Sequence, residues 1–111
     1  MSTVAIEEQR EDRRTAEIHL RLAGPLTAAT APHLRARVRN AVKHGYARLV
    51  VDLQAVTGLD AAGIAALLDA RRTLHSQAGG TLVLRANAIV CRALKDSGTI
   101  AAFALSHGTG M

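Results

Sequence analysis

The side chains that could do acid–base chemistry are few and are spread along the chain. Asp52 and Asp60 are separated by a predicted strand end and a loop, whereas a catalytic pair must be held within reach of one reacting bond. Asp52 is expected to end a strand and to bond to nearby backbone. Asp60 directly precedes a helical pattern and is expected to cap that helix. The two carboxylates are therefore not interpreted as a catalytic pair.

The other reactive residue types also lack the spacing of a catalytic or metal site. The sequence contains 5 histidines and a single cysteine, Cys91, and none of them has a metal-ligand spacing to another. A nucleophile elbow, G-x-S-x-G, and a Walker A motif are both absent from the sequence. Cys91 is expected to pack on a short helix. We expect a protein without metal or cofactor that is not an enzyme.

The formal net charge of +5 favours an anionic partner. One predicted helix carries four basic residues, Arg35, Arg37, Arg39 and Lys43. Aromatic residues make up only 2% of the chain, and none interleaves with these basic side chains as in many nucleic-acid surfaces. A solvated helix face is therefore favoured over a nucleic-acid surface. The nucleic-acid alternative predicts steep salt dependence that charge reversal at Arg35 and Arg39 abolishes.

The composition is typical of one globular domain with an aliphatic core. Hydrophobic residues make up 49% of 111 residues, which favours a single domain over residues 1–111 with an aliphatic core. The single cysteine excludes an intramolecular disulfide and fits a reducing compartment. Acidic residues within 7–12 replace the apolar region of a signal peptide, and no apolar run approaches the roughly 18 residues of a membrane span. We expect a cytoplasmic protein without membrane insertion.

Hydrophobic periodicity predicts strands that alternate with helices. Strands are predicted over residues 18–22, 48–53 and 81–84. Helices are predicted from Thr30 as N-cap to Gly45, from Asp60 as N-cap to Gly79, and over residues 89–95. This order predicts an α/β fold, a single domain with a largely parallel or mixed central sheet and helices packed against it.

The remaining segments have weaker patterns. The sequence favours an edge strand at 4–6, an exposed turn or hairpin end at 7–14, a loop at 55–59, a last strand at 100–105 and a loose tail at 106–111. An exposed edge strand leaves open the pairing of two copies into a homodimer.

The most complete local signal lies in LDAAGIAALLDARR, from Leu59 to Arg72. With Asp60 as N-cap, Leu59 and Ile64 have the spacing of a hydrophobic staple. The first turn then presents Ala61 and Ala62, which offer a small apolar surface and no reactive group.

Three stretches together resemble a known family. They are GPLTAATAPHLRARV (24–38), LVVDLQAVTGLDAAGIAALLDARR (49–72) and GGTLVL (79–84). These resemble, in order, the G-E-L-D-x-x-T-A-P-x-L, D-S-S-G-L and Gly-Gly-x-Leu patterns of STAS domains, the fold of bacterial anti-sigma factor antagonists. The resemblance runs from about residue 15 to 105.

The resemblance implies a partner-switching function. Such antagonists bind an anti-sigma factor, often a serine kinase of the GHKL ATPase type, until phosphorylation of a serine at the start of the central helix breaks the complex. That serine corresponds to Ala62, which cannot be phosphorylated. The resemblance therefore implies a partner surface that is not switchable there, made of Asp60, Ala61, Ala62, Gly63, Thr27 and Thr57.

Several points stay open at this stage. Thr27 stands where the family often has an acid, which reduces the acidity of the partner surface. Thr57 is a candidate phosphoacceptor, although local bonding to backbone is favoured for it. Besides an antagonist locked in its binding state, the sequence fits a STAS scaffold or regulatory subunit, as in a stressosome-like complex or a lipid-transport ABC ATPase. A diverged paralogue with another partner is the third interpretation.

Overall fold

A five-stranded sheet forms the centre of the fold. The computed structural model describes residues 5–12 and 16–106. The strands are β1 (Ala5–Asp12), β2 (Glu17–Leu26), β3 (Arg48–Leu59), β4 (Thr81–Arg85) and β5 (Ala104–Ser106). They lie in the order β1-β2-β3-β4-β5, with β1 antiparallel to β2 and all other neighbours parallel. The predicted α/β fold with a largely parallel sheet is confirmed.

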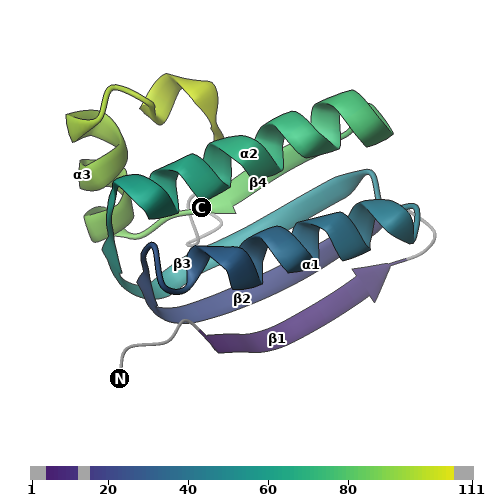
Figure 1. Ribbon diagram of the computed structural model, residues 1–111, viewed down its shortest axis with the longest axis horizontal. Coiled ribbons are helices and arrows are strands. Elements are labelled where there is room, and N and C mark those ends of the chain that lie inside the picture. The colour runs from purple at the N-terminus through teal and green to yellow at the C-terminus, as the bar shows by residue number, and fades with distance from the viewer. Residues whose placement is uncertain (1–4, 13–15, 107–111) are drawn as a thin grey trace.

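Three α-helices and one short 3₁₀ helix connect the parallel strands. These are α1 (Ala31–Lys43), α2 (Ala61–Ala78), α3 (Ala88–Asp96) and η1 (Ile100–Ala102). Figure 1 shows α1 and α2 running side by side, with α3 near the end at which α2 begins. Among the helices of the described ranges, none combines the length and apolarity that crossing a membrane requires.

The core between these elements is aliphatic, as the composition predicts. Its largest fully buried side chains are Leu20, Leu22, Leu26, Leu34, Leu49, Leu53, Leu67, Leu74, Leu84, Leu94, Val38 and Val51. The few aromatic side chains of this sequence join the same core, since Tyr46 and Phe103 are both buried. Burial of these apolar surfaces is the main contribution that holds the helices to the sheet.

Strand β3 is longer than predicted, and the expected loop at 55–59 is wrong. Its parallel pairing with β2 continues through Pro25 opposite Gly58 to Leu26 opposite Leu59. Two register shifts, between Arg21 and Ala23 and between Gly24 and Pro25 of β2, interrupt the pairing without ending it. At each shift β3 carries one extra residue, as in a bulge, and the ladder then resumes. Asp52 therefore does not end the strand. Its carboxylate does bond locally as expected, accepting the Gln54 N–H at 2.9 Å.

The exposed turn or hairpin end predicted at 7–14 is wrong for residues 7–12, which form a strand, although this strand and β2 do pair as antiparallel neighbours. Residues 5–12 form β1, which pairs along its length with β2 at the edge of the sheet. An edge strand can form through backbone pairing with one neighbouring strand, whatever the pattern of its side chains. The strand predicted at 4–6 is thus part of a longer one, although Val4 and residues 13–15 lie outside the described ranges.

The C-terminal strand is shorter than predicted. Residues 100–102 form η1, and β5 follows as three residues paired with β4. Ile100 and Ala102 pack against the core from this 3₁₀ turn, so burial of the apolar run does not require an extended backbone. Ser106 ends β5, and the rest of the predicted tail, residues 107–111, lies outside the described residues.

An ion-pair cluster at the start of β2 gives a pH prediction. Glu17 accepts from His19 at 2.7 Å and pairs with Arg48 of the neighbouring strand. The hydrogen bond from His19, with the charges of His19 and Arg48, holds the pKa of Glu17 below its usual 4.5. This contribution to stability is present above pH 4.5 and is lost as the pH falls through the lowered pKa of the folded protein.

We expect Glu17→Gln to show a shallower loss of stability than the wild type at acidic pH. The difference should be less than about 1 kcal/mol, because the pair is partly exposed. Urea unfolding followed from about pH 7 to about pH 3 measures it. Equal slopes for both proteins below pH 4.5 would show that the ionised Glu17 adds nothing to the folded state.

Candidate functional site

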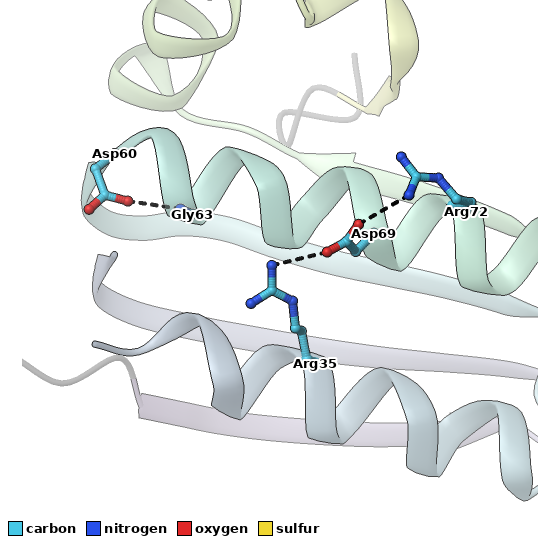
Figure 2. A network of polar contacts seen from close by, with 5 residues as sticks. All are labelled: Arg35, Asp60, Gly63, Asp69 and Arg72. Atoms are coloured by element: carbon cyan, nitrogen blue, oxygen red, sulfur yellow. Dashed lines mark hydrogen bonds and ion pairs between the residues drawn. The ribbon is translucent and has the colours of Figure 1, made fainter. Parts of the chain in front are cut away.

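The first turn of α2 is held by a single carboxylate. Asp60 has extended backbone, and its Oδ1 accepts the Gly63 N–H at 2.8 Å, as Figure 2 shows. This confirms Asp60 as the predicted N-cap, an interaction worth about 1 kcal/mol. Its second oxygen, Oδ2, accepts the Ala28 N–H at 3.3 Å. One side chain thus joins the start of α2 to the segment that follows β2.

Gly63 sits directly against the end of β2. A Cβ at this position would lie 2.2 Å from the Leu26 carbonyl oxygen and 2.8 Å from Leu59 Cδ1. Neither separation is possible for a real Cβ, and the first partner is backbone that cannot rotate away. The glycine is therefore required by the close approach of α2 to β2, with the Asp60 N–H 3.4 Å from the same Leu26 oxygen.

A tight turn at 27–30 lies beside Asp60. Thr30 occupies the N-cap position of α1 as predicted, but its hydroxyl makes no capping bond. The Thr30 hydroxyl instead accepts the Thr27 N–H at 2.8 Å and donates to the Pro25 carbonyl at 2.9 Å. The Thr27 carbonyl accepts the Thr30 and Ala31 N–H groups. This buried hydroxyl fixes the turn that carries the N–H bonded to Asp60.

The six residues implied as a partner surface fall at one end of the sheet, but they differ in exposure. Asp60, Ala61 and Thr57 are exposed, Ala62 and Thr27 are half-buried, and Gly63 is buried. Two further exposed residues, Ala28 and Ala29, lie in the 27–30 turn. Thr57 lies in β3 and not in the predicted loop. The exposed part of this end is thus formed mainly by small side chains around one carboxylate.

The carboxylate of this surface is engaged in fixing the fold. Both oxygens of Asp60 already accept backbone N–H groups, which leaves its carboxylate engaged in fixing the fold. Within the described residues, no group of three His, Cys, Asp or Glu side chains is placed to hold a metal ion. The exposed alanine side chains of this surface leave room for the close approach of another molecule.

Asn87 is a linking residue that the sequence analysis does not single out. Its Oδ1 accepts the Val90 N–H at 2.9 Å and caps α3, while Nδ2 donates to the carbonyls of Gln54 and Val56 at 3.0 and 2.8 Å. An asparagine just before an apolar helical run is itself a capping signal. The two bonds to β3 join α3 to the strand that leads into Asp60.

We expect Asn87→Ala to lower the free energy of unfolding by about 2 kcal/mol, because the helix cap and the two hydrogen bonds to β3 are lost. Asn87→Asp is the matched control, since it keeps the capping oxygen but turns the donor to β3 into an acceptor facing two carbonyls. Chemical denaturation of both variants measures the effect. A wild-type value for Asn87→Asp would show that the bonds to Gln54 and Val56 do not contribute.

The comparison with protein families decides the class of this fold. The family model described as "Mlab, STAS domain" matches residues 10–102, which is most of the chain. The chain belongs to the STAS domain family. The resemblance seen in the sequence is thereby confirmed.

Solved STAS structures share the architecture described above. The chain is 22% identical to an anti-sigma factor antagonist from Mycobacterium paratuberculosis, with a TM-score of 0.74 over 92% of this chain and 84% of that one. It is 17% identical to the Bacillus cell fate determinant SpoIIAA in its phosphorylated form, with a TM-score of 0.65 over 92% and 94% of the two chains. At these identities the matches show a common fold.

A third similar STAS structure comes from a different class of protein. It is a sulfate transporter family protein from Wolinella succinogenes, 18% identical, with a TM-score of 0.72 over 96% of this chain and 88% of that one. No curated protein sequence matches the chain. The same fold therefore occurs in an anti-sigma factor antagonist, a cell fate determinant and a transporter-family protein.

Proposed function

We propose that this STAS domain is a non-enzymatic interaction module that acts as an anti-sigma factor antagonist. Its partner is an anti-sigma factor of the serine-kinase type, and the contact surface is the exposed part of Asp60, Ala61, Ala62, Thr27 and Thr57 around the buried Gly63. The proposal places the protein in the cytoplasm, where such a partner acts.

The observation that carries the proposal is the rigid, small-residue start of α2. Asp60 bonds to Gly63 and Ala28, and Gly63 packs on the Leu26 backbone, so the turn is organised before any partner arrives. Preorganisation lowers the entropic cost of association. Likeness to anti-sigma factor antagonists supports the class of partner.

The proposal includes constitutive binding. By the family resemblance, Ala62 corresponds to the phosphoacceptor serine of antagonists, and alanine has no hydroxyl to accept phosphate. Phosphate would add up to about two negative charges to a packed contact and break it. Without that step the complex would be controlled by synthesis of the two proteins and not by kinase activity at this position.

The first experiment is affinity capture of the tagged protein from its own cells, followed by mass spectrometry, with wild type and Ala62→Glu compared. Enrichment of a GHKL-type ATPase by the wild type and its loss with Ala62→Glu would support the proposal. Enrichment of the same protein by both forms would show that the α2 turn is not part of the interface.

A second candidate function is that of a regulatory STAS subunit of a transport ATPase. The description of the matched family model, "Mlab, STAS domain", and the likeness to a transporter-family protein favour it. The same α2 turn would then contact an ABC ATPase. Capture of an ABC ATPase in place of a GHKL-type protein would select this candidate.

Ala62→Ser separates the two candidates once a partner is purified. An anti-sigma kinase incubated with ATP should phosphorylate the introduced serine, and the complex should then dissociate. An ABC ATPase partner should leave Ala62→Ser unmodified and bound. Phosphoprotein gel mobility and intact mass measure the outcome.

A further inference from the structure

A basic groove runs between α1 and α2, away from the turn described above. It has a volume of about 260 Å³ and a floor that includes Val38 and Ala70. Its polar lining consists of Arg35, Arg39, Asp69, Arg72, Thr73 and Gln77. Asp69 lies roughly two and a half helical turns beyond Asp60 along α2, so the groove and the first turn of α2 are separate surfaces.

The charge of the groove is unbalanced. Asp69 is the only carboxylate in its lining, and it is shared between Arg35 at 3.0 Å and Arg72 at 3.5 Å, as Figure 2 shows. The guanidinium group of Arg39, one turn along α1 from Arg35, is exposed in the same lining. The groove is therefore lined by three arginines and one carboxylate.

The surrounding helices reinforce this positive potential. Outside the groove, α1 and α2 add Arg37, Lys43 and Arg71 but no further acid. An excess of positive charge on two neighbouring helices raises the local concentration of anions and speeds their association. Solvation alone, the interpretation favoured from the sequence, accounts for the exposed Lys43, whereas Arg35, Arg39 and Arg72 line a hollow between the two helices.

We propose that this groove binds an acidic, carboxylate-rich segment of a protein partner. Guanidinium groups form paired, directional hydrogen bonds with carboxylates, and Arg35 is already oriented by Asp69. A nucleic acid fits less well, because Tyr46 and Phe103 are only 4% and 8% exposed and offer no stacking surface. The proposal does not depend on the function proposed for the α2 turn.

The test uses a helical peptide rich in glutamate and the same peptide with glutamine in place of glutamate. Binding is followed by fluorescence anisotropy at low and at physiological salt, and by amide chemical shifts of the full chain. We expect the glutamate peptide to bind at least about tenfold more tightly, with shifts centred on 35–39 and 69–77. The affinity should fall as salt screens the charges.

Charge-reversal variants locate the site. Arg39→Glu combined with Arg72→Glu should lower the affinity for the glutamate peptide at least about tenfold beyond its control. The control is Arg92→Glu with Lys95→Glu on α3, which makes the same change in net charge at exposed positions outside the groove. Arg35 is kept so that its bridge to Asp69 stays intact. If the double variant does not fold, as judged by loss of its helical circular dichroism signal, Arg39→Gln is the milder variant for the same affinity measurement.

Two results would overturn the proposal. Equal losses in the groove and α3 variants would show that only the total charge matters. Tighter binding of a single-stranded oligonucleotide through Arg39 and Arg72 would make the groove a nucleic-acid surface instead.

Discussion

Gly63→Ala is expected to lower the free energy of unfolding by about 2–3 kcal/mol, although alanine is intrinsically the better helix former by up to about 1 kcal/mol. The added methyl group would lie 2.2 Å from the Leu26 carbonyl oxygen and 3.0 Å from the Leu26 carbonyl carbon. Relief requires movement of α2 away from β2, which would strain the bonds from Asp60. In a domain of this size the melting temperature should fall on the order of 10 °C.

Gly58→Ala is the matched control for this prediction. A Cβ at Gly58 meets no atom within 4 Å, and Gly58 is not among the positive-φ glycines. Its effect should stay within about 1 kcal/mol. Circular dichroism melts of the two variants with the wild type measure the difference. Equal melting temperatures for Gly63→Ala and Gly58→Ala would contradict the close packing of α2 on β2.

Ala62→Glu is expected to weaken binding to the captured partner at least about 100-fold, which is about 3 kcal/mol. The carboxylate would be buried without a counter-charge at a contact shaped for a methyl group. The isolated domain should not be destabilised, because an acid in the first turn of a helix interacts favourably with its dipole, by about 0.3–1 kcal/mol. Loss of binding with unchanged or raised stability is therefore the expected combination.

Ala36→Glu controls for the added charge. Ala36 is exposed on α1, so Ala36→Glu makes the same change in residue type and net charge at a position outside the α2 turn. Isothermal titration of each variant with the purified partner gives the affinities. A similar loss for Ala36→Glu would assign the effect to general electrostatics, and an unchanged affinity for Ala62→Glu would place the interface elsewhere.

The parts of the fold that the sequence predicts well depend on neighbours within a few residues. Asp60 caps α2 by bonding to Gly63, only three residues further along. This role can be predicted because the acid, the glycine and the apolar stripe are adjacent in the chain. The buried strands around Val51 and Leu84 are continuous aliphatic runs. Such signals need no knowledge of the partner element.

The missed elements depend on partners far along the chain. Residues 7–12 are polar and show no strand period, yet they form β1 because β2 offers a free edge for backbone pairing. Residues 55–59 contain Thr and Gly but extend β3 because β2 continues beside them. Backbone pairing of this kind leaves little trace in side-chain pattern.

The same distinction applies to the candidate site. The sequence places Asp60, Ala61 and Ala62 on the first turn of α2, and the structure has them there. It cannot reveal that Asp60 also binds the Ala28 N–H, or that Gly63 is needed by the Leu26 backbone. Arg35 and Asp69 likewise meet only because α1 and α2 pack side by side.

The central claim is that the start of α2 and the turn beside it form the partner surface. Hydrogen–deuterium exchange of the full chain, free and bound to the captured partner, tests this most directly. The account predicts added protection at residues 27–29 and 60–64 on binding, with no change at the opposite end of α2 near residues 76–80. Protection confined to that opposite end, with the 60–64 amides unaffected, would contradict it.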